Sequence, residues 1–435
     1  MEMLQEYQYK LARFWRNSRL FRVSSLLAIF VLTVLIVIPL RAQQTITLSF
    51  LLPAPDVAPF PPVIAEFERQ NPGIKVNIIE GPNAANLNED LYTSAFLLGD
   101  SPYDLINLDV TWTPKFAAAG WLKDVTDLIP QSELDQFLPN DIEAGRYEGR
   151  LYRLPYRTDI AMLYYRTDLL EQAGLKPPET FSELINASKT IQEKDQADWG
   201  FLWQGRQYEG LSTVFLEVLE GSGGYWVNPQ TREVGLDQPQ AIDALKFLVS
   251  TVQQRVSPPG VNTYIEEDAR RLYQSGAAVF MRNWPYAWDL LNGEDSPIRG
   301  KVGIKPMVHA QNQQGTGTLG GWGWGISSMS RHPNEAWKLV QYLTSSDVQK
   351  KLVVAGAYLP SRRALYDDPE LVKRYEYFPL VLRVLQNPAL RPAIAQYAQA
   401  SDILQRYVNA AISGSISPED ALRNAANETR TLLGA

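Results

Sequence analysis

The sequence has no cysteine, few histidines and no excess of basic residues. Its 435 residues include only two histidines, His309 and His332, and the formal net charge is −7. The absence of cysteine excludes disulfides, thiol nucleophiles, thiolate metal sites and lipid attachment at an N-terminal cysteine. Two histidines far apart in the sequence do not favour a histidine-based metal or proton-transfer centre. Because nucleic-acid binding calls for clustered lysine and arginine, we expect no metal, no cofactor and no nucleic-acid partner.

The sequence also lacks the G-x-S-x-G, P-loop and H-E-x-x-H motifs, which mark several common classes of enzyme. Aromatic residues are plentiful by contrast, with 11 tryptophans and 21 tyrosines. The chain is long enough for more than one domain. These features favour a large globular protein that is not an enzyme.

A hydrophobic run of 18 residues lies near the N-terminus, at residues 23–40, and reads VSSLLAIFVLTVLIVIPL. It is close to the minimum length for crossing a bilayer. The run follows five basic residues: Lys10, Arg13, Arg16, Arg19 and Arg22. Basic residues on this side keep the N-terminus in the cytoplasm, so we expect the rest of the chain to be exported. Ala42 suits the last position before a signal cleavage site, but Leu40 is a poor residue for the third-last position. A cleaved signal peptide and an uncleaved membrane anchor therefore both remain open.

Strands and helices alternate after this run. We predict a helix at 63–70 and strands at three places: 45–52, 74–80 and 104–108. This β-α-β order favours a mostly parallel sheet, in which ligands bind beyond the carboxyl ends of the strands. Asp109 and Trp112 lie just there, ahead of a helix that we expect to begin with Thr113 as N-cap.

The same pattern continues along the chain. Thr180 and Glu183 form a predicted capping box for a helix that ends near Glu193. Further strands are predicted at 161–166, 276–281 and 322–327, and helices at 333–343 and from Ser401 onward. In TLGGWGWGISS, residues 318–328, alternation with period two predicts that Trp322 and Trp324 lie on one face of a strand. The neighbouring glycines allow a ligand or another backbone to come close.

Six segments in this order resemble the extracellular solute-binding proteins of the sugar-binding class, family 1 of the ABC importers. The segments are FERQNPGIKV, PYDLINLDVTWTPKFAAAGWLKDVTDLI, YRLPYRTDIAMLYYRTDLLEQAGL, AAVFMRNWPYAWDLL, TLGGWGWGIS and GAYLPSRRALYDDP. The resemblance runs from about Thr45 to the C-terminus. It is strongest to trehalose- and maltose-type binding proteins, mainly through RNWPYAW and GGWGWGIS.

The resemblance implies an α/β fold with two lobes that close around a ligand, each lobe a mixed sheet flanked by helices, with three crossings between them. By match, lobe 1 comprises 45–157 and 282–322, and lobe 2 comprises 158–281 and 323–435. Residues 1–44 form the basic cytoplasmic segment and the hydrophobic helix.

The resemblance and the chemistry of sugars together indicate the binding residues. A sugar presents hydroxyls at its edge and C–H groups on its faces, so a site needs carboxylates or amides together with flat aromatic rings. We predict these ligand-binding residues: Asp109, Trp112, Arg157, Asp159, Tyr208, Glu209, Trp284, Tyr286, Trp322, Trp324 and Arg362. Asp56, in the first proline-rich loop, is a further candidate.

Structural roles stay open for several of these residues. Trp112 also suits the anchoring of its helix, and Arg362 a surface salt bridge. Arg157 stands where relatives often have an aromatic residue, and it also suits an ion pair with Asp159. This departure leaves the identity of the sugar open.

The predicted function is the substrate-binding component of an ABC sugar importer. It would capture a di- or oligosaccharide resembling trehalose, maltose, sucrose or glucosylglycerol and deliver it to the membrane permease from the periplasm or another extracytoplasmic space. Binding of a non-sugar solute, such as a peptide or polyamine, is the alternative. A glycoside-acting enzyme that uses Asp109 and Asp159 as its pair of carboxylates is less favoured.

Overall fold

The computed structural model describes residues 5, 8–13, 45–228 and 231–434. The hydrophobic run at 23–40 therefore lies outside the described residues. Within the described ranges, no helix is both long and apolar enough to cross a bilayer. The chain divides into a small unit, residues 1–46 and 73–75, and a large unit that holds the rest. In the small unit the backbone N–H of Ile46 donates to the carbonyl of Gly73 at 2.8 Å.

One sheet of the large unit has the order β3-β11-β6, with β3 at Leu105–Asp109, β11 at Leu319–Ile326 and β6 at Leu154–Ile160. The central strand β11 runs antiparallel to both neighbours. Its register against β6 shifts between Trp322 and Gly323. The shift passes over Tyr156 of β6, whereas the register of β11 against β3 is unbroken from Trp322 to Ile326.

A second sheet has the order β10-β7-β9-β8, with β10 at Val302–Lys305, β7 at Met162–Arg166, β9 at Ala278–Asn283 and β8 at Trp199–Leu202. The pair β8–β9 is parallel, whereas β7 is antiparallel to both β9 and β10. This sheet is therefore mixed. Together with the antiparallel β11 pairs, it corrects the expectation of a mostly parallel sheet, because strands from late in the chain insert between early ones.

Two shorter pairs complete the strands of the described ranges: β1 (Ile46–Pro53) with β2 (Ile74–Gly81), and β4 (Arg146–Tyr147) with β5 (Arg150–Leu151). The helices of the first half are α2 (Phe60–Gln70), α3 (Ala85–Leu98), α4 (Thr113–Ala118), α5 (Gln131–Leu134), α6 (Pro139–Glu143), α7 (Thr167–Ala173) and α8 (Phe181–Gln192). Short 3-10 turns lie at Ala54–Asp56, Thr126–Leu128, Pro259–Thr263 and Arg363–Asp367.

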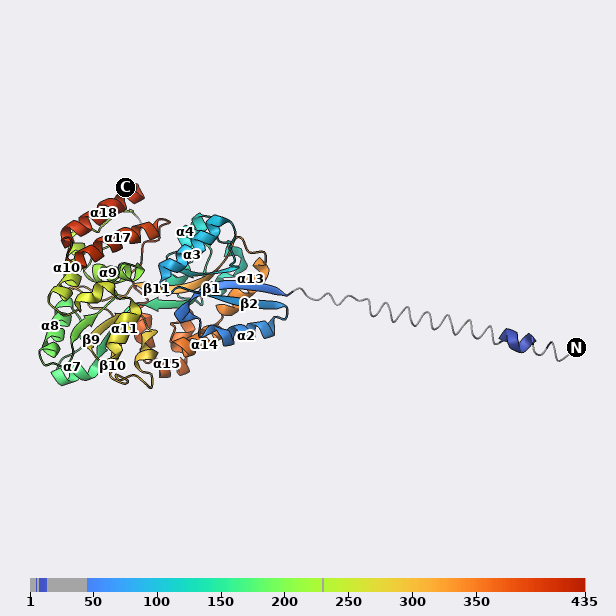
Figure 1. The fold of residues 1–435 in the computed structure, drawn as a ribbon, viewed down its shortest axis with the longest axis horizontal. Helices are drawn as coiled ribbons and strands as arrows, with labels where there is room; N and C mark the ends of the chain where they lie inside the picture. The colour runs from blue at the N-terminus through green and yellow to red at the C-terminus, as the bar shows by residue number, and fades with distance from the viewer. Residues whose placement is uncertain (1–4, 6–7, 14–44, 229–230, 435) are drawn as a thin grey trace. The chain divides into compact units, whose positions relative to one another are not determined.

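The later helices are α9 (Glu209–Gly221), α10 (Pro239–Gln253), α11 (Glu266–Gln274), α12 (Ala287–Leu291), α13 (Pro333–Leu343), α14 (Ser346–Gly356), α15 (Pro369–Arg374), α16 (Phe378–Val384), α17 (Tyr397–Ile412) and α18 (Pro418–Leu433). The last two helices pack against each other and against α9 and α10 (Figure 1). Their buried aliphatic residues join those of the second sheet in one core.

Local sequence signals account for several helix ends. Thr180 accepts a hydrogen bond from the backbone N–H of Glu183 at 3.2 Å, and the Glu183 side chain accepts one from the backbone of Thr180 at 3.2 Å. The capping box predicted for this helix is therefore confirmed. The predicted N-cap at Thr113 is wrong, because Trp112 occupies that position and no side chain caps the helix.

The predicted lobe boundaries cut across the observed contacts. Strand β10, assigned to lobe 1, pairs with β7, assigned to lobe 2. Helix α13, assigned to lobe 2, donates a hydrogen bond from the Tyr342 hydroxyl to the Val63 carbonyl on α2 at 3.1 Å. These contacts join β10 to the second sheet and α13 to the elements around the first sheet. The exact division into lobes stays a prediction.

Candidate functional site

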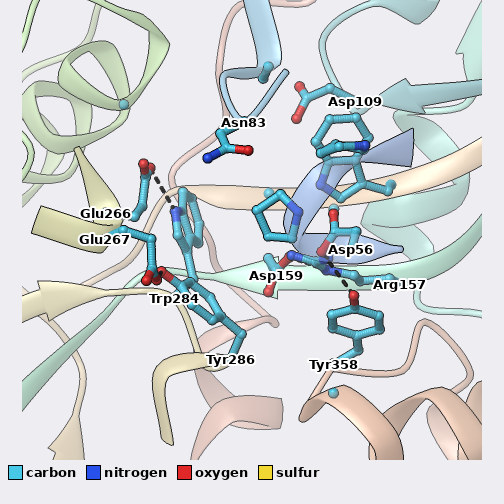
Figure 2. A pocket seen from close by; sticks show the side chains of 18 of the residues that line it. Asp56, Asn83, Asp109, Arg157, Asp159, Glu266, Glu267, Trp284, Tyr286 and Tyr358 are labelled. Carbon is cyan, nitrogen blue, oxygen red and sulfur yellow. Dashed lines mark hydrogen bonds and ion pairs between the residues drawn. The ribbon is translucent and has the colours of Figure 1, made fainter. Parts of the chain in front are cut away.

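A cavity of about 370 Å³ collects polar and aromatic side chains from distant parts of the chain (Figure 2). Asp109 comes from the end of β3, Arg157 and Asp159 come from β6, and Trp284 and Tyr286 follow β9. The volume lies within the range of roughly 300–1,000 Å³ that is usual for small-molecule sites. The cavity also has the usual lining of such sites, in which a few polar groups converge among aromatic rings.

One side of the cavity, called here the ionic wall, consists of Asp56, Arg157, Asp159 and Tyr358 (Figure 2). Arg157 Nε donates to Asp159 at 2.7 Å and its Nη1 donates to Asp56 at 2.9 Å. The guanidinium lies 4.2 Å from the centre of the Tyr358 ring, whose hydroxyl donates to Asp56 at 2.9 Å. Arg157 thus contacts each of the other three members of the wall.

Burial and neighbouring charges act in opposite directions within the ionic wall. Burial, only partly offset by Arg157, raises the pKa of Asp159 to about 6. Burial opposes the charge on Arg157 as well, but the facing carboxylates of Asp159 and Asp56 outweigh it and raise the pKa of the guanidinium. Arg157 therefore stays charged at any physiological pH, while Asp159 changes its charge within the range that cells experience.

The opposite side, called here the aromatic wall, consists of Tyr208, Trp284 and Tyr286 together with Glu266 and Glu267 at the start of α11. Glu266 accepts hydrogen bonds from Trp284 Nε1 at 3.3 Å and from the Tyr208 hydroxyl at 2.6 Å. Glu267 accepts one from the Tyr286 hydroxyl at 2.8 Å. Figure 2 shows Glu266 and Glu267 beside the edges of the Trp284 and Tyr286 rings. The polar atoms of all three rings are therefore bonded to protein.

A close approach of backbone to ring explains one glycine of the GGWGWG stretch. A Cβ atom at Gly320 would lie 3.1 Å from Cζ3 of Trp284 and 3.1 Å from the Asp159 Cβ. Any larger residue at 320 would displace either the ring or the carboxylate. The adjacent Gly321 has φ 133°, a conformation that side chains rarely adopt. The glycines thus allow β11 to pass between the two walls.

A third group, Asp109, Glu209 and Arg391, lies at the same cavity. Arg391 is 3% exposed, and its Nη atoms lie 3.2 Å from Asp109 and 2.8 Å from Glu209. Burial opposes its charge, but Asp109, Tyr397 and Glu209 outweigh burial and raise the pKa of the guanidinium. One cation therefore joins carboxylates from β3 and α9.

Asp109 also shapes the turn that leads to α4. Its Oδ1 accepts hydrogen bonds from the backbone N–H of Thr111 at 3.0 Å and from the Thr111 hydroxyl at 2.8 Å. This turn orients the Asp109 carboxylate, so the same residue shapes the turn and lines the cavity.

Eight of the eleven predicted ligand-binding residues line the cavity: Asp109, Arg157, Asp159, Tyr208, Glu209, Trp284, Tyr286 and Trp322. Asp56 lines it too. The structure thus brings together acids and rings that the sequence separates by up to about two hundred residues. Their role in binding stays a prediction.

Two of the predicted tryptophans lie elsewhere. Trp112 is 3% exposed and packs edge-on against Trp322 at 5.5 Å between ring centres, so it supports a cavity residue without lining the cavity. Trp324 is 1% exposed and packs on Phe50 at 4.7 Å and Tyr156 at 5.2 Å. The register of β11 against β3 is unbroken from Trp322 to Ile326, as the expected alternation requires, but the two indoles have different neighbours and only Trp322 lines the cavity.

Arg362 is the third predicted residue that does not line the cavity. Its Nε donates to the Thr344 carbonyl at 2.7 Å, its Nη1 donates to Gln136 at 3.0 Å, and its Nη2 donates to Glu133 at 2.5 Å. The guanidinium also lies over the Phe137 ring. These contacts fix it among structural elements away from the cavity, so the salt bridge, here partly buried, is the correct interpretation.

The residues that line the cavity include several polar and aromatic ones that the sequence did not reveal, among them Asn83, Glu266, Glu267, Tyr358 and Arg391. Tyr358 stands in GAYLPSRR, the segment that had indicated Arg362, so this segment reaches the cavity through a different residue. Glu266 and Glu267 begin a helix, where acidic residues are ordinary. Nothing local distinguishes them from helix-end charges.

The profile of the family described as bacterial extracellular solute-binding protein matches residues 54–350. The chain belongs to this family. A probable ABC transporter-binding protein of Deinococcus radiodurans is 31% identical to this solute-binding protein over 370 residues, which cover 83% of this chain and 87% of the relative.

Solved structures extend the similarity to the fold. The maltose-bound MalE3 of T. maritima has a TM-score of 0.85 and 38% identity, covering 89% of this chain and 100% of the other. A solute-binding protein of Thermotoga lettingae bound with α-D-tagatose has a TM-score of 0.81 and 27% identity, with 89% and 100% covered. The α/β fold with two lobes is thereby confirmed. The predicted resemblance is confirmed as well, and the family is one of binding proteins and not of enzymes.

Proposed function

We propose that this solute-binding protein is the substrate-binding component of an ABC sugar importer. It captures a di- or oligosaccharide in the cavity and delivers it to a membrane permease. The observation that carries the proposal is the pairing of a ring-lined wall with a carboxylate-lined wall across one cavity. The maltose-bound structure with 38% identity supports a carbohydrate as the ligand.

The two walls match the two kinds of surface on a sugar. Trp284, Tyr286 and Trp322 offer flat faces to the C–H groups of a sugar ring. Asp56, Asp109 and Asp159 offer acceptors to its hydroxyls, and Arg157 offers donors. Because the hydroxyls of Tyr208 and Tyr286 are already bonded to Glu266 and Glu267, the rings contribute contact area more than hydrogen bonds.

We further propose that the lobes close on the sugar by a hinge motion at three crossings, with the β11 glycines at one of them. Residues 1–44 would serve as a signal or as an anchor through the hydrophobic run at 23–40. The protein would act in the periplasm or another extracytoplasmic space. Detection of the intact N-terminal peptide in membrane fractions would distinguish the anchor from a cleaved signal.

Isothermal titration calorimetry tests the proposed function directly. Trehalose, maltose, sucrose and glucosylglycerol form the sugar panel, and spermidine and a tripeptide represent non-sugar solutes. We expect saturable binding of at least one sugar at roughly micromolar strength and recovery of the sugar unchanged. Binding of only the polyamine or the peptide would overturn the proposal in favour of another solute, and release of cleaved sugar would indicate an enzyme.

A further inference from the structure

A fully buried ion pair lies behind the tryptophan of the aromatic wall. Arg282, on β9, and Glu217, on α9, both have 0% side-chain exposure. The Arg282 guanidinium carbon lies 4.2 Å from the centre of the Trp284 ring. Trp284 lines the cavity, whereas neither Arg282 nor Glu217 does. The pair is therefore separated from any bound solute by the indole.

The guanidinium of Arg282 directs its donors into the protein. Nε donates to the Glu217 carboxylate oxygens at 3.2 and 3.0 Å, and Nη1 donates to Gln204 at 3.0 Å. Nη2 donates to Thr213 at 3.3 Å and also to Glu217. Thr213 lines the cavity as well, so the guanidinium contacts the cavity lining at two places, the face of the Trp284 ring and the Thr213 hydroxyl.

This contact is suited to fixing the plane of the ring. A cation within about 6 Å of an indole face is attracted to it, and the attraction is strongest where water is absent. The edge of the same ring is held by Glu266, which accepts from Trp284 Nε1 at 3.3 Å. Face and edge are thus fixed by different charged groups. Burying two charges opposes folding, so packing alone does not explain the presence of an ion pair here.

We propose that Arg282, held by Glu217, is a positioning residue that fixes the plane of Trp284 for stacking on the solute. It raises affinity without touching the solute. The inference rests on the proposed function, because it takes Trp284 as a stacking residue. It adds the buried ion pair to the residues that decide how strongly the cavity binds.

The test removes both charges together in the double variant Arg282→Met/Glu217→Leu, since removing one alone would leave a buried charge unpaired. We expect affinity for the sugar found by calorimetry to fall about 3- to 30-fold, with a melting temperature close to that of the unchanged protein. Arg282→Lys keeps the cation and should recover part of the affinity. The matched control is Arg166→Met/Asp168→Leu, which removes a 2.7 Å ion pair that does not line the cavity.

A second measurement does not depend on any ligand. In protein labelled with fluorotryptophan, the Trp284 fluorine resonance is identified by its loss in Trp284→Phe. We expect it to shift or broaden in the Arg282/Glu217 double variant and to stay in place in the control. If the double variant does not fold, Arg282→Lys and Glu217→Gln serve for both measurements.

The outcomes separate the two proposals. Unchanged affinity, or an unmoved Trp284 resonance, would overturn the positioning role while leaving the proposed function intact. If the unchanged protein bound no sugar, the proposed function would fail, and the fluorine resonance alone would still decide whether the ion pair fixes the ring.

Discussion

The two walls of the cavity hold their side chains in place by opposite means. In the aromatic wall, Glu266 and Glu267 accept hydrogen bonds from the polar atoms at the edges of the rings. In the ionic wall the charged groups bond one another, through the two hydrogen bonds of Arg157 to Asp56 and Asp159. Carboxylates of both walls line the cavity, but on one side they hold the rings and on the other they hold a cation.

This difference predicts different sensitivities. The aromatic wall contributes contact area, which depends on the size and orientation of each ring. The ionic wall contributes acceptors, and its internal hydrogen bonds occupy only part of the acceptor capacity of two carboxylates. Its stability depends on the balance of charge, since a buried charge without a partner is costly. Substitutions should accordingly affect binding through one wall and folding through the other.

Removal of Arg157 should have the largest effect. In Arg157→Met, Asp56 and Asp159 would face each other without their common partner, whose side chain is 8% exposed. We expect the free energy of unfolding at neutral pH to fall by about 3–5 kcal/mol, measured by chemical denaturation. The control Arg150→Met removes a half-exposed partner of Asp124 and should cost less than about 1 kcal/mol. Equal losses in the two variants would contradict the role assigned to Arg157 in the charge balance of the ionic wall.

Removal of Trp284 should have the next largest effect, and on binding. Trp284→Ala should weaken sugar affinity about 30-fold because the stacking face is lost. The control is Trp121→Ala, which removes a ring stacked on Phe96 at 5.1 Å outside the cavity. Calorimetry should show unchanged affinity in the control despite its lower stability. Unaltered binding in Trp284→Ala would mean that the aromatic wall does not carry the sugar.

Neutralising Asp109 should have a smaller effect. Asp109→Asn keeps an acceptor for the Thr111 turn but loses the charge, and we expect about a tenfold loss of sugar affinity. A closely matched control exists in Asp124, which accepts from the Thr126 backbone at 2.9 Å and from its hydroxyl at 2.6 Å. Asp124→Asn should leave affinity unchanged. A similar loss in both variants would point to turn geometry in place of contact with the sugar.

A pH effect at Asp159 should be the smallest. Burial raises the pKa of this carboxyl to about 6. Arg157 opposes the rise, whereas Asp56 and Asp109 add to it. The ionised form accepts hydrogen bonds from sugar hydroxyls, so affinity should fall as pH drops through 6 and level off above it. We expect a loss of about three- to fivefold between roughly pH 7 and pH 5. Asp159→Asn should abolish this dependence, and a profile unchanged by that substitution would assign the titration to another group.

Local signals predicted much of the fold. The capping box at Thr180 and Glu183 is confirmed because both hydrogen bonds connect residues three apart. The predicted strand that begins at Ile74 and the helix that begins at Pro333 are confirmed as well. The mostly parallel sheet failed because β11 arrives from more than two hundred residues beyond β3 and pairs antiparallel with it. No local sequence pattern predicts that pairing.

The candidate site likewise contains residues that the sequence indicates and residues that it does not. Asp109 ends β3, Trp284 follows β9 and Asp159 lies near the end of β6, and the resemblance to known binding proteins indicates all three. Arg391 lies on an irregular segment, and its partners Asp109 and Glu209 are far away in the sequence. Without coordinates, nothing distinguishes it from other arginines near the C-terminus.

The sequence by itself determined that cysteine chemistry is excluded, where many of the helices and strands begin, and which family the chain resembles. Only the tertiary structure decided which of two tryptophans, two residues apart on one strand, reaches the cavity. Trp322 reaches it and Trp324 is buried in the core. The physical reason is position along the strand. Trp322 stands opposite Asp109, where β3 ends at the cavity, whereas Trp324 stands opposite Asn107 and is covered by Phe50 and Tyr156.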